Sequence, residues 1–263
     1  MKKSIKALSV ALMLTLLPFA SGCSKQQPQQ PQKPAEPVTL SISAAASLKD
    51  SLNEVAKLYQ TEKSNVTLNI NYGSSGTLQQ QIEQGADVDL FISAAAKQMD
   101  ALESKDLIVK DTRKTLLESD VVLVVPKDNT TITSFKDLTK ASHIALGEPK
   151  SVPAGQYAEE VLKKLGMMDS IKSKIVYGKD VKEVLSWVET GNADAGIVYT
   201  TDAKVSTKVK IVDTAPADSH TPVVYPAAVI KASKKATDSS DFLKFLSDTK
   251  AKAVFEKYGF KVK

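Results

Sequence analysis

Short apolar runs alternate with amphipathic runs from Val38 to the end of the 263-residue chain, and this alternation restricts the fold more than any other feature. Val38 to Ser43 and Val66 to Tyr72 have the composition of strands. The stretch between them, Leu48 to Thr61, repeats apolar residues at helical spacing. The same strand–helix rhythm continues along the chain. It predicts an α/β fold in which each lobe is a mostly parallel sheet flanked by helices.

The rhythm restarts after a run of valines, which suggests a second lobe. Asp120 to Pro126 holds four valines and a leucine and is typical of a fully buried strand. Ser239 to Tyr258 near the end is expected to be a single amphipathic helix. A chain of this length fits two lobes. We predict a first lobe over 38–121 plus 226–263 and a second lobe over 122–225.

The amino-terminal segment has the pattern of an export signal. Lys2 and Lys3 precede an uncharged, leucine-rich run from Ala7 to Ala20, which is too short to span a bilayer comfortably, and small residues lead up to Cys23. This order is typical of a lipoprotein cleavage site. We predict a signal peptide over 1–22, lipid on Cys23 and a protein anchored on the extracytoplasmic face of the cell membrane. The alternative is an ordinary cleaved signal with an incidental thiol.

Residues 23–37 are rich in Gln and Pro, and the prolines recur every third residue, which predicts an extended tether. The formal charge of the chain is +5, and loss of the three signal-peptide lysines leaves +5 − 3 = +2. Arg113 is the only arginine, and the lysines are interspersed with acids. Because nucleic-acid binders cluster their basic residues, we expect no nucleic-acid partner.

Five strand-to-helix junctions offer small side chains, hydroxyls and backbone N–H groups, and ligands of open α/β sheets bind at such junctions. They lie at 44–50, 73–77, 152–155, 178–181 and 196–200. Asp180 and Glu183 stand at capping-box spacing, so Asp180 is expected to satisfy deeper amides and leave that of Val181 facing the cleft. Converging neutral donors and helix dipoles describe a site for an oxyanion.

Six motifs spread over residues 38–263 resemble those of the molybdate-binding solute receptors of bacterial ABC transporters. The motifs are Ala44–Leu48, Gly85–Ala94, Val152–Ala158, Gly196–Tyr199, Asp218–His220 and Lys257–Phe260. This resemblance implies the two-lobed type II periplasmic binding protein fold, with the ligand in the cleft. It also implies two hinge segments, near Val121–Val125 and Val223–Ala228.

Carried over residue by residue, the resemblance implies five oxyanion-binding residues: Ser47, Ser75, Ala154, Val181 and Tyr199. Hydroxyls would come from Ser47, Ser75 and Tyr199, and amides from all but Tyr199. Gly76 departs from the family pattern, which often has a third serine there, and this makes Ser74 a possible substitute for Ser75. No residue is expected to bind a metal cation directly, since molybdenum would arrive only as molybdate, and no cofactor is expected.

These inferences predict a monomeric lipoprotein receptor, not an enzyme, that captures molybdate or tungstate and delivers it to an ABC permease. The two anions are nearly the same size, so the residues leave that choice open. Alternatives are a receptor for sulfate, phosphate, another oxyanion or an Fe(III)–anion pair, and a purely structural lipoprotein. A hydrolase would need a nucleophile beside a base. Only His143 and His220 are available, and neither has a recognisable triad context.

Overall fold

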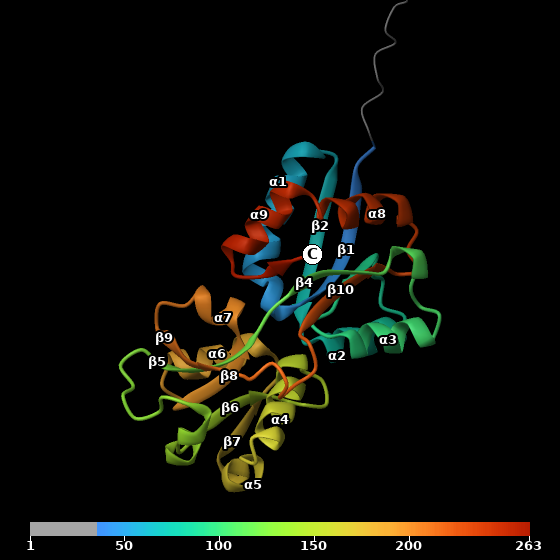
Figure 1. Ribbon diagram of the computed structural model, residues 1–263. Coiled ribbons are helices and arrows are strands. Elements are labelled where there is room, and N and C mark those ends of the chain that lie inside the picture. Colours follow the sequence, from blue (N-terminus) through green and yellow to red (C-terminus); the bar gives the residue numbers. More distant parts are fainter. Residues whose placement is uncertain (1–35) are drawn as a thin grey trace, which may run out of the picture. The chain divides into compact units, whose positions relative to one another are not determined.

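Two sheets organise residues 36–263, the part of the chain that the computed structural model describes (Figure 1). The predicted signal peptide, Cys23 and all but the last residues of the tether lie outside the described residues. The six-stranded sheet, in the order β11-β4-β10-β3-β1-β2, forms the first lobe, and the five-stranded sheet, in the order β7-β6-β8-β5-β9, forms the second.

The bounds of the first-lobe strands are β1 (Val38–Ala45), β2 (Val66–Gly73), β3 (Leu90–Ile92), β4 (Lys114–Glu118), β10 (Val224–Val229) and β11 (Lys261–Val262). Its helices are α1 (Lys49–Glu62), α2 (Ser75–Glu83), α3 (Ala96–Ser104), α8 (Ala236–Phe245) and α9 (Thr249–Lys257), with 3₁₀ turns at Ala46–Leu48 and Lys110–Thr112. Buried side chains of α1, α8 and α9 pack on one face of the sheet, and those of α2 and α3 pack on the other.

The bounds of the second-lobe strands are β5 (Val121–Pro126), β6 (Ile144–Gly147), β7 (Ile175–Gly178), β8 (Ala195–Tyr199) and β9 (Val209–Thr214). Its helices are α4 (Pro153–Lys164), α5 (Met168–Ile171), α6 (Val181–Glu189) and α7 (Thr200–Lys204), with 3₁₀ turns at Phe135–Lys140 and Lys172–Lys174. Val121 to Val125 are all buried, as the valine run predicted. Within residues 36–263 no helix combines the length and apolar character needed to span a bilayer.

Both sheets are mixed, although the sequence predicted mostly parallel ones. β1 pairs in parallel with β2 and β3, and β6 pairs in parallel with β7 and β8. β5 and β10, the first strands after each passage between the lobes, are antiparallel to these neighbours. The parallel strands run toward the other lobe, so a strand that enters from that lobe must run the opposite way.

Residues 36–263 pass between the lobes twice. Ser119–Asp120 link β4 to β5, and residues 215–223 link β9 to β10. The Ala215 N–H donates to the Val121 carbonyl at 2.9 Å, so the two passages lie side by side. The resemblance implied hinges near Val121–Val125 and Val223–Ala228, but nearly all of these residues belong to strands β5 and β10. The linking residues lie just before these strands in the sequence.

The carboxyl-terminal helix was predicted as one element over 239–258, and this prediction is wrong. The structure has two helices there, α8 and α9, separated at Leu246–Asp248. The Asp248 side chain accepts a hydrogen bond from the Lys250 N–H at 2.9 Å and caps α9. Aspartate at such a position competes with the helical hydrogen bond, so a new helix begins there.

Candidate anion-binding site

A small cavity between the lobes contains all five residues that the sequence predicted as anion ligands. Its empty volume is about 200 Å³, and twelve residues line it. Ser47 and Ser75 come from the first lobe, and Ala154, Val181 and Tyr199 come from the second. All five are buried. The lining residues lie at the carboxyl ends of strands or the starts of helices, the place where the sequence predicted a ligand.

Two adjacent serines of the first lobe, Ser74 and Ser75, line the cavity, and their hydroxyls differ in their hydrogen bonds. Ser75 begins α2, and its Oγ accepts a hydrogen bond from the Ala94 N–H at 3.0 Å, which leaves the hydroxyl hydrogen to donate. Ser74 also lines the cavity, but its hydroxyl donates to Thr77 Oγ1 at 2.8 Å and its Oγ caps α2 by accepting from the Thr77 N–H at 3.3 Å. The geometry therefore favours Ser75 over Ser74 as a donor to a ligand.

Ser47 follows β1 in the 3₁₀ turn that leads into α1. Its Oγ lies 3.0 Å from the hydroxyl of Tyr225, a residue of β10. When Tyr225 is the donor in this bond, the hydrogen of the Ser47 hydroxyl remains available for a ligand. The sequence did not single out Tyr225, and no local signal could have identified it, because 178 positions separate the two residues.

The second lobe contributes backbone amides at two helix starts. Asp180 caps α6 by accepting from the Glu183 N–H at 3.0 Å, as the capping-box spacing predicted, and Val181 is the first helical residue. In α4 the first residue is Pro153, which has no N–H. The first N–H of this helix is therefore that of Ala154. The next two amides, those of Gly155 and Gln156, donate to the Val152 carbonyl. Amides in a first turn have no partner inside the helix, so those of Val181 and Ala154 are available.

Tyr199 ends β8 and its side chain is 1% exposed. Among the described residues its hydroxyl has no hydrogen-bond partner. Burial raises the pKa of this phenol well above its usual value, so it stays protonated and neutral. A buried hydroxyl without a partner costs free energy unless a ligand satisfies it. Tyr199 is therefore suited to donate a hydrogen bond to an anion.

Helix termini, and not cationic side chains, supply partial positive charge at the cavity. No lysine or arginine is among the twelve lining residues, and the one carboxylate among them, Asp180, caps α6. The amino termini of α2, α4 and α6 face the cavity through their first residues, and each carries a partial positive charge. Such a site suits an oxyanion held by neutral donors. Residues 36–263 hold no cluster of His, Cys, Asp or Glu arranged to bind a metal ion.

The two histidines lie outside this cavity. His143 precedes β6, where its N–H donates to the Asp194 carboxylate at 2.9 Å, and the Nδ1 of His220 lies 2.6 Å from the carbonyl oxygen of Thr221. Neither residue lines the cavity.

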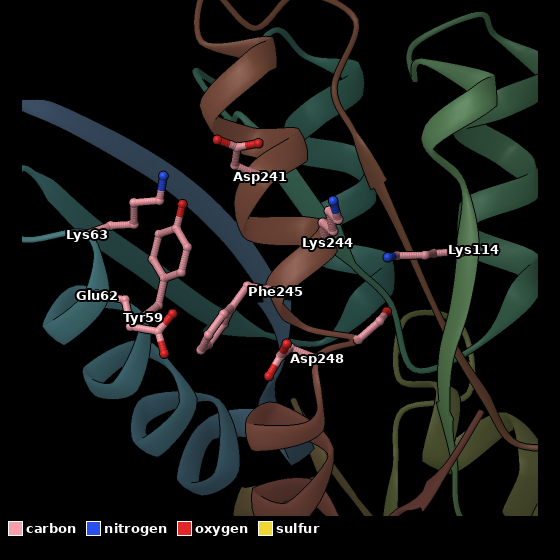
Figure 2. Close-up of a pocket in the computed structure, with 9 residues that line it drawn as sticks. Tyr59, Glu62, Lys63, Lys114, Asp241, Lys244, Phe245 and Asp248 are labelled. Atoms are coloured by element: carbon pink, nitrogen blue, oxygen red, sulfur yellow. The ribbon is translucent and has the colours of Figure 1, made fainter. Parts of the chain in front are cut away.

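A wider hollow on the first lobe has different chemistry (Figure 2). Its empty volume is about 870 Å³, and it lies between the carboxyl-terminal ends of α1 and α8 and the strand β4. Both lysines and acids line it: Lys63, Lys114 and Lys244 with Glu62, Asp241 and Asp248. This end of α1 is remote from the carboxyl ends of the parallel strands, and the mixed charge does not favour an anion.

Comparisons with known proteins identify the family. The model of a family described as bacterial extracellular solute-binding proteins matches residues 40–261. The molybdate-binding protein ModA of Haemophilus influenzae is 42% identical over 267 residues, which cover 99% of this chain and 100% of that protein. The chain belongs to the ModA family of bacterial solute-binding proteins.

Two further similar proteins support the same assignment. YvgL of Bacillus subtilis, by name an ABC transporter substrate-binding lipoprotein, is 49% identical over 248 residues, which cover 94% of this chain and 95% of that protein. The solved structure of the Azotobacter vinelandii periplasmic molybdate-binding protein is 25% identical, with a TM-score of 0.78, and covers 85% of this chain and 99% of that one. The resemblance and the type II periplasmic binding protein fold are confirmed. The chain is a solute-binding protein of an ABC transporter and not an enzyme.

Proposed function

We propose that this protein captures molybdate in the cavity between its lobes and delivers it to the permease of an ABC transporter. The single observation that carries the proposal is that donors from both lobes line one cavity that no cation lines. The names of its ModA relatives support the choice of molybdate. A cation or a neutral sugar would not match a set of converging N–H and O–H donors.

In this proposal seven donors hold the anion. Hydroxyls come from Ser47, Ser75 and Tyr199, and backbone amides come from Ser47, Ser75, Ala154 and Val181. The buried Tyr199 hydroxyl, which has no partner within residues 36–263, and the free hydrogen on Ser75 support these roles. Tyr225 would act through Ser47 by fixing the direction of its hydroxyl. Molybdenum would be bound only through the oxygens of molybdate.

Closure of the lobes follows from this division of donors. An anion that contacts only one lobe makes part of its hydrogen bonds, so it binds the closed form more tightly and shifts the equilibrium toward it. Ser119–Asp120 and residues 215–223 are the segments about which we propose that the lobes move. Release to the permease would then require reopening.

Selectivity among tetrahedral anions would come from the directed donors. An anion of another size leaves some donors unpaired, which costs free energy in a buried site. Hydrogen phosphate also brings a proton, and a hydroxyl that turns to accept it can no longer donate to the anion. Molybdate and tungstate are expected to bind alike because their sizes are nearly equal. Sulfate or phosphate as the natural ligand is the alternative.

Isothermal titration tests this function on the mature protein with molybdate, tungstate, sulfate and phosphate. We expect molybdate and tungstate to bind with similar affinity. Sulfate and phosphate should bind at least about fivefold more weakly, because a single unpaired donor costs about 1–3 kcal/mol. Equal affinities for sulfate and molybdate would contradict the proposed selectivity. The absence of any binding heat with molybdate would overturn the proposed function.

We further propose that lipid on Cys23 holds a monomer at the outer face of the membrane by the tether of residues 23–37. The name of the relative YvgL supports a lipoprotein. In cells, a Cys23→Ala variant should appear in the soluble fraction, whereas the unsubstituted protein should appear in the membrane fraction. Equal membrane retention of both would contradict the anchor.

A further inference from the structure

A lysine beside the cavity forms ion pairs with two acids, one from each lobe. The Nζ of Lys182, in α6 of the second lobe, lies 2.7 Å from Oδ2 of Asp50, in α1 of the first lobe. It also lies 3.3 Å from Oδ1 of Asp202, in α7 of its own lobe. None of the three lines the cavity, so none is among the proposed anion ligands.

Lys182 occupies an unfavourable position for a cation. It is the second residue of α6, where the partial positive charge of the helix terminus repels an ammonium group. The Lys182 side chain is 24% exposed and the Asp202 side chain is 0% exposed. Burial alone would lower the pKa of Lys182, but the charges of Asp202 and Asp50 outweigh it and raise the pKa. The lysine is therefore charged and its charge is compensated by the two acids.

The ion pair connects the two chain segments that carry anion donors from opposite lobes. Asp50 lies three residues after Ser47, and Lys182 directly follows Val181. α6 also packs against the 3₁₀ turn at Ala46–Leu48. On α2 the Gly76 N–H donates to the Ser151 carbonyl at 2.9 Å, which is a second direct bond between the lobes. Both bonds adjoin the cavity and hold the lobes together.

We propose that Asp50 and Lys182 are positioning residues that form an interlobe latch: their ion pair forms on closure, holds the Val181 amide opposite Ser47, and slows release of the anion. Asp202 keeps the Lys182 side chain directed toward the first lobe in both the open and the closed form. The inference rests on the function proposed above, since it concerns the same cavity.

The direction in which one substitution changes the molybdate affinity distinguishes this latch from a purely electrostatic effect. Asp50→Asn removes a negative charge near an anion site, so Coulomb repulsion alone predicts tighter molybdate binding. A latch predicts weaker binding, by about fivefold for a pair with a 44% exposed carboxylate, and a faster dissociation rate with little change in the association rate. Asp50→Glu keeps the carboxylate and should restore the affinity to within about twofold of the unsubstituted protein.

Glu54→Gln is the matched control because it removes the same charge from the same helix. Its carboxylate pairs with Lys257 and Tyr258 of its own lobe, so it should leave molybdate affinity nearly unchanged. Titration calorimetry gives the affinities, and stopped-flow fluorescence of Trp187, the sole tryptophan, gives the rates. Lys182→Met, which also leaves the buried Asp202 unpaired, should lower affinity as well and show no further loss when combined with Asp50→Asn.

Each outcome bears on one of the two proposals. Weaker binding and faster release by Asp50→Asn, with Glu54→Gln unchanged, support the latch. Equal or tighter binding by Asp50→Asn, while the unsubstituted protein binds molybdate, overturns the latch and leaves the receptor function intact. Equal weakening by Glu54→Gln overturns it as well, because the effect would then come from the charge of α1. No binding by the unsubstituted protein overturns the function itself.

Discussion

The Tyr199→Phe substitution should change ligand-free stability and ligand affinity in opposite directions. The hydroxyl that it removes is buried and has no partner among the described residues. Its loss should leave the ligand-free protein as stable as before, or more stable by up to about 1–3 kcal/mol. In the liganded protein the same hydroxyl would donate to an anion. Hydrogen bonds to charged groups contribute about 1.5–3 kcal/mol, so the dissociation constant for molybdate should rise about 10- to 150-fold.

The measurements are thermal unfolding without ligand and titration calorimetry with molybdate. Because burial keeps the pKa of Tyr199 well above 10, the loss of affinity should be the same from about pH 6 to 9. Tyr157→Phe is the matched control, since this neighbouring phenol lies outside the cavity and donates only a long 3.4 Å bond to the Pro222 carbonyl. An affinity within twofold of the unsubstituted protein, or a destabilised ligand-free Tyr199→Phe variant, would refute the reasoning.

Two other substitutions test the contact between the lobes and a buried charge. A Cβ on Gly76 would lie 2.5 Å from the Ser151 carbonyl oxygen, so Gly76→Ala should weaken molybdate binding by about tenfold or more without destabilising the ligand-free protein. Calorimetry and thermal unfolding check this, and unchanged affinity would mean that the Ser151 segment moves away freely. Burial raises the pKa of Asp202 from 3.8 to about 6, against the opposing effect of Lys182. The folded state therefore prefers the protonated acid, and this residue's contribution to stability is present below about pH 4 and is lost as the pH rises through 6. Urea unfolding at pH 4.5 and 7.5 should show the stability of Asp202→Asn rising by about 2 kcal/mol relative to the unsubstituted protein at the higher pH, and a pH-independent difference would contradict the buried charge.

Local signals in the sequence gave correct predictions where neighbouring residues decide the structure. Glycine is a local signal for a helix end, and Gly166 and Gly191 adopt φ values of 67° and 73° just after helices α4 and α6. Asp180 caps α6 through an amide three residues away. The apolar face predicted for 48–61 is buried, including Leu52 and Tyr59. These features depend on backbone conformation within one turn, so they can be predicted without knowledge of the fold.

The same reasoning failed where two local signals competed. The apolar spacing of 239–258 is continuous, but the Asp248 cap interrupts the helix between α8 and α9. Sheet direction was also missed, because composition does not reveal from which lobe a strand enters. In β5 and β10 the order of the passages between the lobes determines that direction.

The sequence by itself determined the strand–helix rhythm, the helix caps and the residue types at each junction, and its motifs pointed to the ModA family. Only the tertiary structure decided which groups meet: Ser47 with Tyr225, Lys182 with Asp50, and Gly76 with Ser151. These partners are 178, 132 and 75 (151 − 76) positions apart. Contacts over such separations depend on two lobes that pack around one cavity, a condition that no short stretch of residues encodes.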